Sequence, residues 1–121
     1  MINVKDQVYA ALCTVCDNVS DIYPHDWEIL PAIQYVEESN TVYTKTDEKE
    51  NASYLRYRID IWDKGSTTQT TLAVDKAIAA LGLVRTACQD VEDPSRHRHK
   101  QMRYEGIIDN DTEIVYWEGN R

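Results

Sequence analysis

The sequence predicts an α+β domain in which two α-helices pack on one face of an antiparallel or mixed β-sheet. Residues 3–19 and residues 66–82 place apolar side chains at helical spacing, which is typical of amphipathic helices. Residues 52–63 alternate between apolar and polar side chains, which indicates a strand with one packed face and one open face. The elements follow in the order helix, strands, helix, strands, as in α+β domains.

Length and charge limit the class of protein. The chain has 121 residues, which suits a single domain over residues 1–121. It carries 21 Asp and Glu against 13 Lys and Arg, and this net charge of -8 argues against a general nucleic-acid binder. The longest apolar run, residues 78–84, is far shorter than the roughly 20 residues of a membrane span. We see no secretion signal, and three cysteines cannot all pair in one chain, so we expect the reducing cytoplasm.

The N-terminal third should form a helix, a loop and a strand. The helix is expected over residues 3–19, with Asn3 as its N-cap. Two prolines bracket residues 25–30, which we expect to be a surface loop with a partly buried Trp27. Strand-like alternation follows in residues 32–36.

Residues 39–51 form the most polar stretch of the chain. We expect a long loop, because thirteen residues exceed a usual connection and long loops are commonly functional. The alternative is a twisted extension of a hairpin, since Val42 and Tyr43 are good strand formers.

The rest of the chain should form a strand, a helix and a β-hairpin. Gly65 ends the strand over residues 52–63, and Ser66 with Gln69 resembles a capping box that opens the second helix. Gly82 lies where a C-terminal glycine cap belongs. Two antiparallel strands, residues 83–91 and 99–108, are expected around a turn at 92–95, and a last strand over residues 113–117.

Two patterns resemble metal or redox motifs. Cys13 and Cys16 form a C-x-x-C, but it lies inside the expected helix and has no second pair to complete four zinc ligands. His97 and His99 would share one face of a strand, which is a metal-ligand geometry. Three neighbouring cations oppose a divalent ion there, so we expect one basic limb of a charged hairpin, and a metal site stays the alternative.

Catalytic motifs are absent from the sequence. It contains no G-x-S-x-G, no phosphate-binding loop and no H-E-x-x-H. The acids show no spacing that marks a general acid and base pair. We therefore expect no enzyme, no cofactor and no catalytic residue.

The open face of the sheet is the most informative surface. Alternation across three strands places six side chains on one side: Arg56, Arg58, Asp60, Arg85, Arg103 and Glu105. They form either a solvated face with cross-strand ion pairs or a subunit interface, where Arg pairs with a neighbour's acids. Trp62 and Tyr116-Trp117 are aromatic anchors for such an interface, or they cover the edge of the core.

Several segments together resemble a known family. They are the N-terminal helix, the long polar stretch, and the residues around Leu81-Gly-Leu83, with the following strands: Pro31-Ala-Ile-Gln-Tyr-Val-Glu37, Tyr57-Arg-Ile-Asp-Ile-Trp62 and His99-Lys-Gln-Met-Arg-Tyr-Glu-Gly106. In their order the chain resembles the small tail-completion, or tail-terminator, proteins of long-tailed bacteriophages and prophages, the group of the lambda-type tail terminator. The resemblance covers nearly the whole chain, but it is a loose pattern that related head–tail connector proteins share.

The resemblance implies a structural virion protein, assembled in the bacterial cytoplasm, at the head–tail interface. Such proteins form a ring, usually a hexamer, that caps the tail tube, stops its growth and offers a docking surface for the head. The implied partners are copies of the chain itself, the tail tube protein and a head-completion or connector protein. DNA would pass through the channel without specific binding, and no membrane is involved. The alternatives are a neck or head-closure protein, or a monomeric metal- or small-molecule-binding domain.

The expected contact residues lie in three places. These are the long polar stretch, the Arg-bearing sheet face and the charged hairpin. We assign as subunit or tube contacts Tyr43, Lys45, Asp47, Glu48, Lys49, Glu50, Arg56, Arg58, Asp60, Trp62, Arg85, Arg96, Arg98, Lys100 and Arg103.

Overall fold

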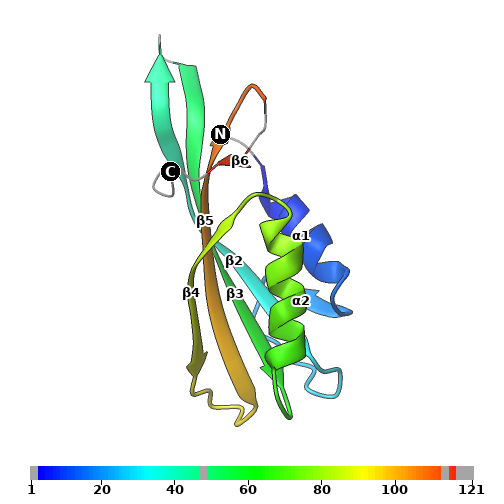
Figure 1. Ribbon diagram of the computed structural model, residues 1–121. Helices are drawn as coiled ribbons and strands as arrows, with labels where there is room; N and C mark the ends of the chain where they lie inside the picture. The colour runs from blue at the N-terminus through cyan, green and yellow to red at the C-terminus, as the bar shows by residue number, and fades with distance from the viewer. Residues whose placement is uncertain (1–2, 47–48, 113–114, 117–121) are drawn as a thin grey trace.

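The computed structural model describes residues 3–46, 49–112 and 115–116, and it confirms the predicted α+β class. One mixed sheet and two helices make up the fold (Figure 1). The elements are, in chain order, α1 (Lys5–Cys13), β1 (Asn18–Ser20), β2 (Ala32–Thr46), β3 (Lys49–Asp63), α2 (Thr68–Ala79), β4 (Val84–Val91), β5 (Arg98–Asp109) and β6 (Val115–Tyr116).

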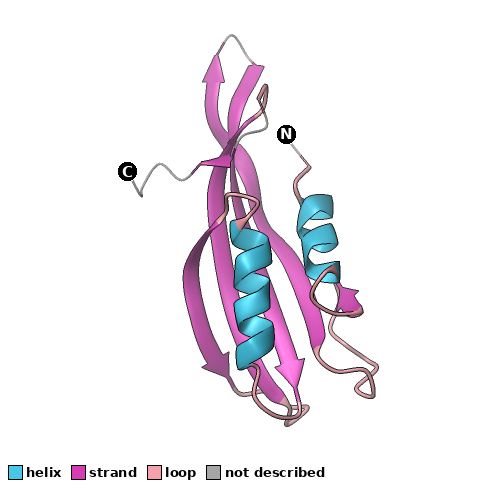
Figure 2. Cartoon of the chain, turned by 45° about the vertical axis from the view of Figure 1, so that its right-hand side comes forward, coloured by secondary structure: helices cyan, strands magenta, loops and turns pink. Residues whose placement is uncertain are grey.

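The strands lie in the order β1-β2-β3-β5-β4, and β6 pairs with β5. β1 pairs with β2 in parallel, and all other pairs are antiparallel. Both helices lie in front of the same face of this sheet (Figure 2). The opposite face is the open one, and it carries the polar side chains of β3 and β5.

The core lies between the helices and the sheet. The alternation predicted for β3 is confirmed, since four side chains of one face are fully buried: Leu55, Tyr57, Ile59 and Ile61. They pack with Met102 and Tyr104 of β5 and with the buried side chains of both helices, which are Val8, Leu12, Val74 and Ile78. Each fully buried aliphatic side chain stabilises the fold by roughly 1.5–3 kcal/mol.

Two core tyrosines have their hydroxyls bound by carboxylates. The hydroxyl of Tyr104 donates to Asp75 of α2 at 2.7 Å, and that of Tyr57 donates to Glu37 at 2.7 Å. Burial, and then these hydrogen bonds, raise the pKa of both phenols. The rings can therefore fill the core without leaving a buried hydroxyl unpaired.

The first helix is shorter than predicted. It ends at Cys13, and Val19 lies in β1, opposite Ile33 of β2. The Thr14 hydroxyl donates to the Ala11 carbonyl at 2.6 Å, which favours a helix end over continuation. The predicted N-cap is also wrong, because Val4 occupies that position and Asn3 donates to the Asp6 side chain instead.

The polar stretch is a hairpin rather than a loop. The preferred prediction for residues 39–51 was wrong and its alternative is confirmed, because β2 continues to Thr46, which pairs with Lys49 of β3. We call residues 42–46 and 49–53 the arm. At about 3.3 Å per residue, each of its strands spans roughly 15–20 Å. Figure 1 shows that the arm projects beyond the ends of both helices.

The second helix begins differently from the prediction and ends as predicted. Thr67 is its N-cap and has no side-chain cap bond, so the capping box is wrong, and the Ser66 hydroxyl accepts the Thr68 N–H instead. Gly82 has a φ of 93°, and its N–H donates to Ala79 at 2.9 Å, which confirms the glycine cap. The predicted hairpin of β4 and β5 is confirmed. Only residues 115–116 of the predicted last strand lie within the described part of the chain.

We predict that Leu12→Ala lowers the free energy of unfolding by about 3 kcal/mol, because it leaves a cavity in the core beneath α1. Urea denaturation of dilute protein would measure the loss. Leu72→Ala is the matched control, because Leu72 of α2 is 66% exposed and should change the same quantity by less than about 0.5 kcal/mol. Equal losses in the two variants would contradict this core assignment.

Candidate functional site

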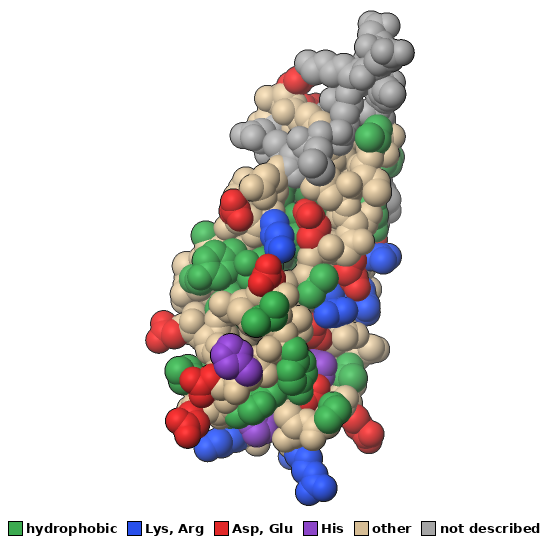
Figure 3. Space-filling view, turned by 180° about the vertical axis from the view of Figure 1, so that it is seen from behind, with side chains coloured by type: hydrophobic (Ala, Val, Ile, Leu, Met, Phe, Trp, Pro, Cys, Tyr) green, Lys and Arg blue, Asp and Glu red, His purple; other side chains and the backbone are tan. Residues whose placement is uncertain are grey.

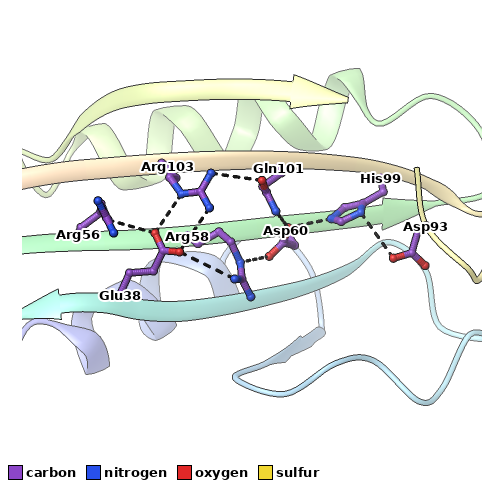
Figure 4. Close-up of polar contacts among 8 residues, drawn as sticks. All are labelled: Glu38, Arg56, Arg58, Asp60, Asp93, His99, Gln101 and Arg103. Atoms are coloured by element: carbon purple, nitrogen blue, oxygen red, sulfur yellow. Dashed lines mark hydrogen bonds and ion pairs between the residues drawn. The ribbon is translucent and has the colours of Figure 1, made fainter. Parts of the chain in front are cut away.

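The open face of the sheet carries one carboxylate surrounded by three arginines (Figure 4). The carboxylate is that of Glu38, which lies in a bulge of β2. Glu37 pairs with Tyr57 and Ser39 pairs with Arg56, so Glu38 has no partner in the register. The bulge turns the Glu38 side chain to the open face, while the Glu37 side chain accepts the hydroxyl of the core residue Tyr57.

Glu38 spans β3 to reach all three guanidinium groups. Arg103 of β5 binds it with two nitrogens, Nε at 3.0 Å and Nη2 at 3.4 Å. Arg56 Nε lies 3.3 Å and Arg58 Nη1 lies 3.9 Å from its oxygens. Burial alone would raise the pKa of Glu38, yet the hydrogen bond and charge of Arg103 and the charges of the other two arginines lower it. The three arginines therefore favour the ionised form of Glu38 at the centre of the open face.

A second polar group continues from this one along β3. Asp60 is buried and accepts three hydrogen bonds, from Arg58 Nε at 2.8 Å, from Gln101 Nε2 at 3.1 Å and from the ring of His99 at 2.8 Å. The other ring nitrogen of His99 lies 3.6 Å from Asp93. Polar contacts thus run without interruption from Glu38 to the turn between β4 and β5 (Figure 4). We call this set the ion-pair network.

Asp93 fixes that turn to the open face. Its carboxylate accepts the hydroxyl of Tyr23 at 2.7 Å and the backbone N–H of Ser95 at 3.0 Å. Burial alone would raise the pKa of Asp93, but the hydrogen bonds from Ser95 and Tyr23 lower it to about 2. Asp93 is therefore ionised at neutral pH and joins two segments that are 70 residues apart in the chain.

An aromatic cluster closes the same end of the open face. Trp62 stacks on His99, with ring centroids 4.5 Å apart and planes at 19°. Tyr23 and Trp27 meet Trp62 edge-on at 5.5 and 6.0 Å, and His97 lies 4.7 Å from Trp27. Trp27 is partly buried, as predicted. In the view from behind, hydrophobic side chains gather near the histidines in the lower half of the molecule (Figure 3).

The structure brings most of the predicted open-face residues together. Arg56, Arg58, Asp60 and Arg103 are all in the ion-pair network. Glu105 lies opposite Arg56 and accepts the hydroxyl of Tyr54. Burial, and then this bond, raise the pKa of Tyr54 to about 12.

The placement of Arg85 on the open face was wrong. A bulge between Arg85 and Ala87 shifts the alternation of β4, so Arg85 lies opposite the core residue Tyr104. Its Nη1 binds Asp75 of α2 at 3.0 Å. Arg85 therefore joins β4 to the helix layer.

Two of the expected contact residues are corrected by their burial. Trp62 is 1% exposed and Asp60 is 2% exposed, and both have their partners within their own chain. Trp62 packs on His99, Tyr23 and Trp27 at the end of the open face, whereas the alternative given for it was the edge of the core. Neither side chain reaches the surface that a partner would touch.

The remaining expected contact residues lie at the two ends of the molecule. In the arm, Tyr43 is 42% exposed, Lys45, Lys49 and Glu50 lie on the paired strands, and Asp47 and Glu48 lie outside the described residues. At the other end, Arg96 and Arg98 are exposed, and Lys100 binds Asp90 at 2.9 Å. The hydrogen bond to Asp90 raises the pKa of Lys100; burial opposes it, and the charge of Asp90 adds to it.

The cysteine and histidine motifs do not form a metal site in the described part of the chain. His97 precedes β5 and packs on Trp27, while His99 is held between two carboxylates. No set of three His, Cys, Asp or Glu lies close enough to hold a metal among the residues that the structure describes. Cys13 and Cys16 are both unpaired, and they lie at and beyond the end of α1.

Sequence reasoning missed Glu38, Asp93 and Tyr23. Each acts through a contact with a distant part of the chain, and no local pattern marks such a contact. The one available signal was the pair Glu37-Glu38 at the end of an alternating strand, where two successive acids break the period of two.

Comparison with other proteins assigns this chain to no family. No protein-family model matches the chain, and the search of curated proteins found no match. Within the described residues, no helix is long and apolar enough to cross a membrane. The fold and the site define a small α+β protein whose open sheet face holds a network of ion pairs.

We predict that Asp93→Asn removes about 2 kcal/mol from the free energy of unfolding at pH 7. A carboxylate whose pKa is lowered to about 2 stabilises the fold above its ordinary pKa and loses this effect as the pH falls from about 4 to about 2. Urea titrations at several pH values would show the difference from wild type shrinking over this range. Asp17→Asn, at an exposed position, is the control and should leave the profile unchanged. A constant difference at all pH values would count against the assignment.

We also predict a coupling energy of about 1 kcal/mol between Glu38 and Arg103, because both are partly buried and share two hydrogen bonds. A double-mutant cycle with Glu38→Gln and Arg103→Gln would measure it. The coupling should fall at high salt less than that of the exposed pair Lys5 and Asp21, which serves as control and should give less than about 0.5 kcal/mol. Similar values for the two pairs would show that the network is an ordinary solvated surface.

Proposed function

We propose that this chain is a structural protein of a long-tailed bacteriophage that forms a ring on the end of the tail tube. In this role it terminates tail growth and provides the surface to which the head is joined. The proposal rests on the resemblance described above and on one structural feature, the projecting arm. Within the described residues, only Ala52 and Ser53 of the arm pair with a further strand, β5, and the arm extends beyond the helices (Figure 1), so we assign it to contact with another molecule.

The exposed side chains of the arm support this role. Val42 and Tyr43 are 54% and 42% exposed. Apolar and aromatic side chains on a protruding hairpin are typical anchors of protein interfaces. At the base of the arm, Ala52 and Ser53 are buried where β3 pairs with β5. We therefore propose that the face with Tyr43 meets the tube or a neighbouring subunit.

The edges of the sheet support ring formation. Among the described residues, no strand pairs with the outer edge of β4 or with the outer edge of β2 beyond Gln34. These two edges lie on opposite sides of the sheet and differ in sequence. Unpaired edges are templates for strand pairing. Contacts between two different surfaces of identical subunits close into rings when the rotation allows it.

The charge of the chain is compatible with DNA passage. The net charge is -8, and the three arginines of the ion-pair network already face carboxylates of their own chain. An acidic channel wall would repel phosphate and let the genome pass without binding. A neck or head-closure protein of the same particle would use the same surfaces, and tube binding separates the two roles.

We predict that Tyr43→Ser abolishes association with tail tubes while the free energy of unfolding stays within about 0.5 kcal/mol of wild type. The tubes would be assembled from purified tail tube protein and viewed by electron microscopy. Tyr9→Ser is the matched control, because Tyr9 on α1 is 43% exposed and should leave the tube ends capped.

If the Tyr43→Ser variant still caps the tubes, the assignment of the arm to tube contact is wrong. A wild-type protein that never appears on tube ends, but binds the purified connector protein, would favour the neck role instead. Failure to bind either partner would contradict the proposal as a whole.

A further inference from the structure

The outer face of α2 is unusually poor in charge. Residues 68–80 contain only two charged side chains, Asp75 and Lys76. Asp75 is bound by Arg85 and by Tyr104, toward the sheet. This leaves Lys76 on an exposed face that otherwise carries only uncharged side chains: Thr68, Gln69, Leu72, Ala73, Ala79 and Ala80. The solvent face of a surface helix is usually charged, so this face is suited to contact with another protein.

A groove lies beside this face, between α2 and the end of α1. It has a volume of about 410 Å³ and is lined by Thr14, Val15, Ala73, Lys76, Ala77 and Ala80. The groove exists because the side chains that α2 contributes to it are mostly alanines. Lys76 forms no ion pair with any residue of the described segments. The groove therefore suits aliphatic side chains with an acid beside them.

The loop over residues 21–31 presents such side chains. Ile22 and Ile29 are 57% and 51% exposed. Between them in sequence lie the exposed acids Asp26 and Glu28, and Glu28 forms no ion pair within the part of the chain described. The loop is thus an apolar surface with an acidic rim.

The loop is also held rigidly. The Ser20 hydroxyl donates to the Ile22 carbonyl at 2.9 Å, and the Asn18 side chain donates to the Ile29 carbonyl at 2.9 Å. Asn18 and Ser20 are two residues apart on β1, so their attachment points are about 7 Å apart. On the inner side, Trp27 packs on Trp62. Anchors held in place before binding lose little conformational entropy on docking.

We propose that the 21–31 loop of one copy of this chain docks into the α1–α2 groove of a second copy. Ile22 and Ile29 enter the groove, and Glu28 pairs with Lys76 at its rim. The two surfaces are different, so the contact is head-to-tail and allows a ring. It rests on the self-assembly part of the proposed function and assigns to it a contact separate from the arm and from the sheet edges.

The first test is the oligomeric state in solution. Analytical ultracentrifugation over a concentration series should show wild type self-associating and Ile29→Ser shifted to monomer. Tyr9→Ser is the control, since Tyr9 of α1 is 43% exposed and lies outside the loop, the groove lining and the arm, and it should associate as wild type does. A monomeric wild type, or loss of association in Tyr9→Ser alone, overturns the inference. Loss of association in Ile29→Ser with unchanged unfolding supports it.

A charge exchange tests the pairing itself. Lys76→Glu and Glu28→Lys should each weaken association by about tenfold, and the variant with both changes should regain most of it. No recovery of association in the double variant would overturn the pairing of Glu28 with Lys76.

Tube binding separates this inference from the proposed function. Association through the loop and groove without any binding to tail tubes would leave the inference standing and remove the tail role. If Ile29→Ser binds tubes and forms rings of wild-type size, the tail role stands and the contact between loop and groove is overturned.

Discussion

The alternation of β3 between β2 and β5 is the constraint on which the other contacts depend. Its apolar side chains face the helices, and its polar side chains face outward, so a shift of one residue would exchange the two sets. The same register aligns Arg58 with Arg103 and Asp60 with Gln101. The hydrophobic core therefore fixes the register, and the register in turn places the ion-pair network.

The buried charges of the network are tolerable only because they are paired. Removal of a carboxylate from water without partners would cost several kcal/mol. Asp60 accepts three hydrogen bonds, and Asp93 is bound by Tyr23 and Ser95. These bonds hold the 21–31 loop and the turn between β4 and β5 against the sheet. At this end of the open face, polar contacts rather than the hydrophobic core therefore fix the structure.

The sequence was sufficient where the pattern was local and regular. The alternation of β3, the stripe of α2 and the glycine cap at Gly82 were predicted, because each depends on neighbours along the chain. The errors occurred where a single residue interrupts the period. The bulge at Glu38 and the bulge after Arg85 change the face of a side chain, and the only sequence signal is the pair of acids Glu37-Glu38 at the first of them. The arm was ambiguous because polar strands without a packed face lack a clear period.

The molecule separates its surfaces by chemistry. The open sheet face has paired charges, the outer face of α2 (here the helix face) carries only the charge of Lys76, and the arm extends from one end with exposed Val42 and Tyr43. Paired charges are already satisfied within the chain and gain little from a new partner, whereas exposed apolar side chains gain by burial. Assembly contacts are therefore expected at the helix face, the loop and the arm rather than at the arginines. Through the bond between Asp93 and Tyr23, the ion-pair network also holds the 21–31 loop against the sheet.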